Sequence, residues 1–132
     1  MNQEFYNIVD DITEKDQRYR EDAYAFVMEA LNYTQKRFKR VKHVSGDELL
    51  EGMRELLMER FGPMTMLVLA YWGVQSTDDF GNIVFNLVSH KLLNKADEDT
   101  LEVFRNRYDF TEVFDKGYRQ LLDKRISRMR AH

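Results

Sequence analysis

Residues that interrupt helices are rare in this chain, and this scarcity constrains its fold more than any other feature. Pro63 is the one proline among 132 residues, and there are only six glycines. Few breakers and a charged fraction of 33% favour long helices over a series of short strands. A hydrophobic fraction of 43% supplies a buried core, so the chain is predicted to form one globular domain, 1–132.

The stretch HVSGDELLEGMRELLMERFGP contains the clearest predicted helix. Ser45 and Glu48 have the spacing of a capping box, in which each side chain accepts a hydrogen bond from an otherwise unpaired backbone N–H. Gly62 and Pro63 then end this helix and start the next one. Between these signals, one face of the helix is apolar, and it consists of Leu49, Leu50, Met53, Leu56 and Leu57.

The same periodicity predicts further helices at 3–13, 19–41, 63–73 and 76–92, and a last one from 109 onward. The 63–73 helix is nearly all apolar, so we expect it at the centre of the molecule. The last helix is expected to have an apolar face that includes Leu121 and Leu122. Residues 94–108 allow two interpretations, since TLEVF alternates like a strand but also fits one or two helical turns.

Several blocks of this sequence resemble a small bacterial family of conserved hypothetical proteins. These blocks are DQRYREDAYAFVMEALNYT, HVSGDELLEGMRELLMERFGP, YWGVQSTDDFGNIVFNLV and YDFTEVF. The resemblance covers most of the chain. It implies no activity, because no function is assigned to that family.

Residues 46–110 resemble a winged-helix regulator in the order of their parts. A helix, a short helix, a glycine turn and a long helix are followed by LLNK, an acidic hairpin candidate and a strand-like run. Two features depart from that pattern. Leu69 stands where a small residue usually precedes the turn, with Ala70 one position later, and the wing tip has acidic residues instead of arginines. Those acidic residues are Asp97, Glu98 and Asp99.

The predicted fold is therefore mainly α, with five to six helices around one core, a winged-helix-like C-terminal half and a candidate two-stranded wing. Residues 1–44 are expected to supply the N-terminal helices. Residues 45–110 are expected to form the winged-helix-like core, and residues 111–132 a C-terminal helix with a basic tail.

The helix after the glycine turn has a narrow polar strip that includes Asn82, Asn86 and His90. Asparagine can pair bidentately with adenine, so the strip is a candidate DNA contact. Asp78 and Asp79 in the first turn disfavour an approach to phosphate, and a net charge of −3 gives no overall attraction to nucleic acid. We therefore favour a solvated strip or a polar contact to another protein.

Two basic clusters, QKRFKRVKH and DKRISRMR, are a second candidate contact for nucleic acid. If the fold joined them, they could bind a phosphate backbone. The simpler interpretation is a helix end whose cations complement the helix dipole, together with a solvated tail. The candidate backbone contacts are Lys36, Lys39, Arg40, Arg105, Arg107, Arg125 and Arg128.

Catalytic, cofactor-binding and metal-binding residues are not predicted. The chain has no cysteine, and it contains neither a glycine-rich phosphate loop nor a G-x-S-x-G motif. His43, His90 and His132 lie far apart in the sequence and match no metal-ligand spacing. Phe85 lies off the main apolar stripe of its helix, which suggests a second packing layer or a partner subunit.

These observations favour a non-enzymatic cytoplasmic binding module that contacts protein, with a second copy of the chain as one candidate partner. The alternative is a nucleic-acid-binding transcriptional regulator. No membrane partner is predicted, because the start of the chain lacks a secretory signal pattern and PMTMLVLAYWGV is about half the length that spans a bilayer.

Overall fold

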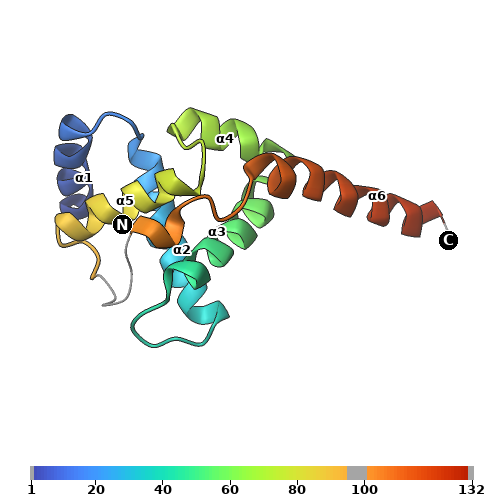
Figure 1. The fold of residues 1–132 in the computed structure, drawn as a ribbon, viewed down its shortest axis with the longest axis horizontal. Helices are drawn as coiled ribbons and strands as arrows, with labels where there is room; N and C mark the ends of the chain where they lie inside the picture. Colours follow the sequence, from blue (N-terminus) through green and yellow to red (C-terminus); the bar gives the residue numbers. More distant parts are fainter. Residues whose placement is uncertain (1, 95–100, 131–132) are drawn as a thin grey trace.

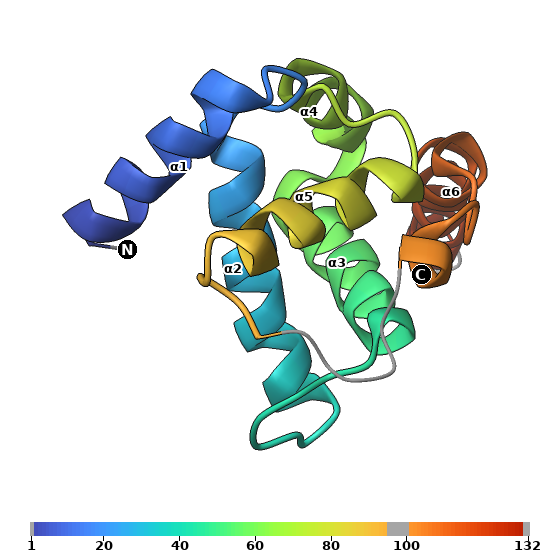
Figure 2. The ribbon, with the colours of Figure 1, turned by 60° about the vertical axis from the view of Figure 1, so that its left-hand side comes forward.

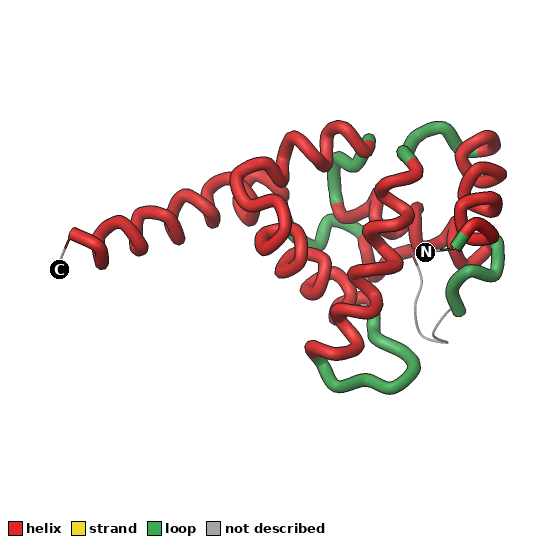
Figure 3. Tube along the Cα trace, turned by 180° about the vertical axis from the view of Figure 1, so that it is seen from behind, coloured by secondary structure: helices red, strands yellow, loops and turns green. Residues whose placement is uncertain are grey.

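The computed structural model of the chain describes residues 2–94 and 101–130, and all regular structure in these stretches is helical (Figures 1 and 3). The mainly α prediction is confirmed. The longer helices are α1 (Gln3–Lys15), α2 (Glu21–Arg37), α3 (Gly46–Phe61), α4 (Thr65–Trp72), α5 (Thr77–Ser89) and α6 (Gly117–Arg130). Three short helices are η1 (Gly62–Met64), η2 (Leu101–Phe104) and η3 (Thr111–Lys116).

Local capping chemistry determines where several of these helices begin and end. Ser45 and Glu48 form the predicted capping box, with Ser45 Oγ accepting from Glu48 N at 3.0 Å and Glu48 Oε1 accepting from Ser45 N at 3.0 Å. Gly73 ends α4 in the left-handed region, with φ of 83°. The predicted helix 19–41 is too long, because α2 ends at Arg37 and Lys39 adopts a φ of 56°.

The centre of the molecule is the pair α2 and α3, with α5 crossing α2 (Figure 2). A Cβ on Gly52 of α3 would overlap Thr34 Oγ1 of α2, so glycine is needed where the two helices approach each other. Buried Thr34 is satisfied within its own helix, because its Oγ1 donates to Ala30 O at 2.6 Å.

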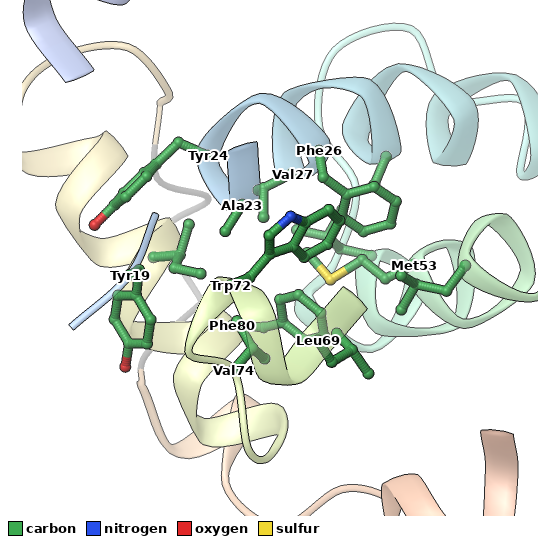
Figure 4. Packing of buried hydrophobic residues seen from close by; sticks show 14 of the residues in the cluster. Tyr19, Ala23, Tyr24, Phe26, Val27, Met53, Leu69, Trp72, Val74 and Phe80 are labelled. Carbon is green, nitrogen blue, oxygen red and sulfur yellow. The ribbon is translucent and has the colours of Figure 1, made fainter. Parts of the chain in front are cut away.

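Trp72, at the end of α4, lies within the core and joins the helices (Figure 4). Its ring centroid is 5.1 Å from that of Phe26 on α2 and 5.7 Å from that of Phe61 on α3. Phe80 of α5 packs against Phe26, with 6.4 Å between their ring centroids. Aromatic contacts of this kind add stability beyond the area that they bury.

Helix α4 lies at the surface, so its predicted central position is wrong. Leu67 and Tyr71 are 63% and 58% exposed, whereas Leu69 and Trp72 are buried. A short helix that packs from one side turns only one face toward the core. Because α4 has apolar residues on all its faces, the face that points away from the core is apolar and exposed to solvent.

Of the two interpretations of residues 94–108, helical turns are confirmed at Leu101–Phe104, which form η2, and the candidate wing strand is not, since the described residues contain no strand. The burial of Phe104 against α5 accounts for this outcome. A Cβ on Gly81 would lie 2.7 Å from Phe104 Cβ, so the glycine makes room for this ring. The acidic tip of the candidate wing, Asp97 to Asp99, lies outside the described residues.

Helix α6 extends away from the body formed by the other helices (Figures 1 and 3). The apolar anchors of this region are Phe110 and Phe114, which are buried with their ring centroids 5.4 Å apart. Leu121 and Leu122 are 40% and 42% exposed, and no residue of α6 is buried. The core is therefore built by α1 to α5 with Phe104, Phe110 and Phe114. The expected basic tail is part of a projecting helix that continues to Arg130.

Candidate functional site

The two asparagines of the polar strip on α5 are engaged inside the molecule. Asn82 Nδ2 donates to the Tyr19 hydroxyl at 2.9 Å. Asn86 Nδ2 donates at 3.0 Å both to Asp16 Oδ2 and to the Tyr24 hydroxyl. Figure 4 shows these tyrosines at the edge of the core, with their hydroxyls pointing away from Trp72. Both donor hydrogens of Asn86 Nδ2 and one of Asn82 Nδ2 are therefore already used to attach α5 to residues 16–24.

The aspartates at the start of α5 also have internal partners. Asp79 Oδ1 accepts from the Tyr19 hydroxyl at 2.5 Å, and Asp79 Oδ2 accepts from the backbone N–H of Gln75 at 2.7 Å. Asp78 Oδ1 accepts from the backbone N–H of Asn106 at 2.7 Å. The sequence interpretation of these aspartates as helix-start residues agrees with this geometry, which also ties them to distant segments.

The pKa values of Asp16 and Tyr19, two residues of this network, are both shifted further away from neutral pH. The Arg18 guanidinium donates to Asp16 and lowers the pKa of that carboxyl far below its usual range. Burial raises the pKa of the Tyr19 hydroxyl, and its hydrogen bond to Asp79 raises it further. Asp16 is therefore charged and Tyr19 is protonated at pH 7, as expected for a structural connection and not for a proton-transfer site.

The contacts of Asp16 and Tyr19 with the asparagines of α5 were not predicted from the sequence. Their partners on α5 lie 60 or more residues away in the sequence, so no local motif reveals these contacts. His90, the third residue of the strip, lies at the end of α5 with its Nδ1 2.9 Å from Asn86 O.

The two basic clusters do not join. Figures 1 and 2 place the C-terminal end of α2 and the C-terminal end of α6 in separate parts of the molecule. Lys36, Lys39 and Arg40 belong to the first cluster, and Arg40 pairs with Glu48 at 2.9 Å. Arg125 and Arg128 belong to the second cluster and lie exposed on α6. The other proposed backbone contacts are also paired, Arg105 with Glu102 and Arg107 with Asp47.

An apolar groove of about 670 Å³ lies between α2, α5 and η2, and it is the best candidate for a binding site. Its hydrophobic walls come from α2, from Val44 and the start of α3, from α5 and the residues just after it, and from η2. The apolar residues lining it are Met28, Leu31, Val44, Leu49, Val84, Phe85, Val88, Leu92, Leu93, Leu101 and Phe104.

Phe85 lies off the main apolar stripe of α5, for which the sequence suggested a second packing layer or a partner subunit, and in the structure it lines this groove. Phe85 is 55% exposed and lines the groove beside half-buried Val84 and Val88. The polar lining includes the exposed side chains of Lys42 and His43 and, from η2, that of Glu102. The site therefore combines an apolar interior with polar groups of both charge signs that remain accessible to water.

Comparison with protein-family models, with curated proteins and with solved structures gave no match for this chain. The resemblance to a small bacterial family stays a prediction. In the described part of the chain, no helix is both long and apolar enough to cross a bilayer.

Proposed function

We propose that this protein is a non-enzymatic binding module whose apolar groove holds a small, mainly apolar molecule. The observation that carries the proposal is the groove of about 670 Å³, lined by hydrophobic side chains from α2, α5 and η2. Ligand sites in proteins are typically apolar clefts of about 300–1,000 Å³ with a few polar groups. The polar groups here are exposed instead of converging in the interior, which favours binding over catalysis.

The charges around the groove favour a neutral ligand. Lys42 and His43 stand on the loop after α2, and Glu102 stands on η2, so neither sign dominates the described lining. A ligand that covers on the order of 250 Å² of apolar surface gains roughly 6 kcal/mol from burial before the costs of association. We therefore expect weak binding of simple aromatic or aliphatic molecules, with dissociation constants no tighter than about 40 μM.

A titration with N-phenyl-1-naphthylamine, a neutral dye that fluoresces in apolar surroundings, tests this proposal. Val88→Phe places a larger side chain in the groove and should weaken dye binding about tenfold or more. Val68→Phe is the matched control, because Val68 is also a half-buried valine on a helix but lies outside the groove. Unsaturable dye binding, or an equal loss in the two variants, would refute the proposal.

The second candidate function is nucleic-acid binding on a winged-helix-like scaffold. The observation in its favour is α6, which exposes Arg119, Lys124, Arg125, Arg128 and Arg130 in a single helix. The internal hydrogen bonds of Asn82 and Asn86 weigh against base reading, so such binding would use the phosphate backbone. Fluorescence anisotropy with duplex DNA at low and high salt measures it, and salt-sensitive micromolar binding would favour this candidate.

A further inference from the structure

We propose that α6 of one copy docks into the hollow between α2 and α4 of a second copy, in a reciprocal two-fold exchange. This inference is independent of the proposed ligand function, because the hollow and the groove share no lining residue among those described. It rests on the exposure of α6, on the charge of the two surfaces and on the shape of the hollow.

Helix α6 has an apolar face that nothing in the described body covers. Its exposed apolar side chains are Leu121, Leu122, Ile126 and Met129, at 40%, 42%, 38% and 75%. Residues three and four apart lie on one face of a helix, so Leu122, Ile126 and Met129 form a stripe. A contiguous exposed apolar stripe of this kind is typical of a surface that packs against a partner.

The charge of α6 is opposite to that of the rest of the chain. Residues 117–130 contain five Lys or Arg and one Asp, a net charge of +4. Residues 1–116 contain 15 Lys or Arg and 22 Asp or Glu, a net charge of −7. Complementary charges of this size attract α6 toward the body of a second copy and speed their encounter.

The hollow between α2 and α4 has the properties that a cationic amphipathic helix needs. It measures about 520 Å³, and exposed Leu67 and Tyr71 of α4 form one side of it. Asp22 and Glu29 of α2 form the acidic side together with Arg60 of α3, which pairs with Glu29, so two carboxylates and one guanidinium leave a net charge of −1 there. Apolar residues of α6 can therefore bury the exposed face of α4 while its arginines lie along the acidic side.

The position of α6 explains why the hollow accepts a helix from a second copy. The base of α6 lies beside η1, with the Tyr118 ring 3.5 Å from where a Cβ of Gly62 would be. From there the helix points away from the body (Figure 1), so it does not fold back over its own α4. The base of α6 and the hollow therefore lie close together on the same protomer. With a two-fold axis beside them, α6 of each copy can reach the hollow of the other, and the two contacts are identical.

The interface area is sufficient for a dimer. A helix of this length is roughly 21 Å long, so one face covers on the order of 300 Å² and buries a similar area of the hollow. Reciprocal exchange buries two helix faces and two hollows, roughly 1,200 Å² in all, at the lower end of the range for stable interfaces. A dimer with micromolar affinity and clear salt dependence follows.

Cysteine cross-linking in the full-length chain tests the contact directly, because the native sequence has no cysteine. A mixture of Ile126→Cys and Leu67→Cys chains should give hetero-dimers under mild oxidation. The matched control pairs Ile126→Cys with Val41→Cys, since Val41 is 95% exposed and lies outside the hollow. Sedimentation velocity from micromolar to near-millimolar protein, at low and high salt, gives the dimerisation constant in parallel.

The expected results are preferred cross-linking of the 126–67 pair and a dimer weakened about a hundredfold by Leu122→Glu with Ile126→Glu. Circular dichroism verifies that this variant stays folded, which is expected because α6 contributes nothing buried to the core. A monomer at all concentrations overturns the proposal. Cross-linking of Ile126→Cys mainly with itself overturns it in favour of α6–α6 pairing, and a monomer that binds duplex DNA through α6 overturns it in favour of nucleic acid.

Discussion

Replacement of Asn86 by alanine should destabilise the fold by about 2–3 kcal/mol, although Asn86 lies on the polar strip of α5. The variant loses the hydrogen bond to the Tyr24 hydroxyl and the one to the Asp16 carboxylate, both 3.0 Å long. A neutral hydrogen bond contributes about 1 kcal/mol and one to a charged group about 1.5–3 kcal/mol. Alanine's higher helix propensity returns roughly 0.6 kcal/mol, which is included in the net figure.

Urea unfolding at pH 7, followed by far-ultraviolet circular dichroism, measures this loss. With a urea dependence of about 1.5–2 kcal/mol per molar for a domain of this size, the midpoint should fall by roughly 1.5 M. Asn32→Ala is the matched control, because Asn32 is exposed within α2 and its replacement brings the same gain in helix propensity. The control should be unchanged or slightly stabilised.

A double-mutant cycle with Tyr24→Phe locates the effect. The two side chains should show a coupling energy of about 1 kcal/mol, since each single variant removes the same hydrogen bond. If Asn86→Ala unfolds at the same urea concentration as Asn32→Ala, the network does not stabilise the fold. The Asn86 amide would then be available to a ligand, and base reading by α5 would regain support.

Two further predictions concern the segment that joins α1 to α2. Gly73→Ala should lower the free energy of unfolding, measured in urea, by at least about 2 kcal/mol, because Gly73 has a φ of 83° and a Cβ there would overlap Arg18 O. The φ angle alone would cost roughly 1 kcal/mol. A smaller loss than this would show that the backbone shifts to relieve the overlap. Arg18 lowers the pKa of Asp16 below its unfolded value of about 3.9, so the stability from this pair is complete above that pH and declines as the pH falls below it. The stability difference between the native chain and Asp16→Asn should therefore shrink from pH 7 to pH 3, and a constant difference would contradict this assignment.

Elements with strong local signals could be predicted, and those that depend on distant contacts could not. The capping box at Ser45 and Glu48 and the turn at Gly73 depend on neighbouring residues alone, and both are present. For Leu101–Phe104 the sequence left a strand and helical turns open, and it could not choose between them because Phe104 packs over Gly81 of a distant helix. The pattern of residues within a segment cannot show that a glycine on a distant helix leaves space for one of its side chains.

The candidate site, too, could be predicted only in those features that depend on neighbouring residues. The sequence singled out Phe85 as an outlier on its helix but could not locate the groove, because α2 and η2 supply the other walls. It found Asn82 and Asn86 as a polar strip, whereas their partners Tyr19, Asp16 and Tyr24 come from another part of the chain. Whether a polar residue is exposed depends on which other segments pack over it. A helical wheel shows only the residues of one helix, so it cannot give this information.

The sequence by itself determined the helical class and most helix boundaries, because periodicity, capping residues and breakers act within a few residues of one another. It also determined the excess of positive charge near the C-terminus. Only the tertiary structure decided that α4 keeps an apolar face in solvent, that α6 leaves the core, and that the asparagines of α5 face inward to tyrosines. The physical reason is that burial is a property of pairs of surfaces, and packing in three dimensions selects which surfaces meet.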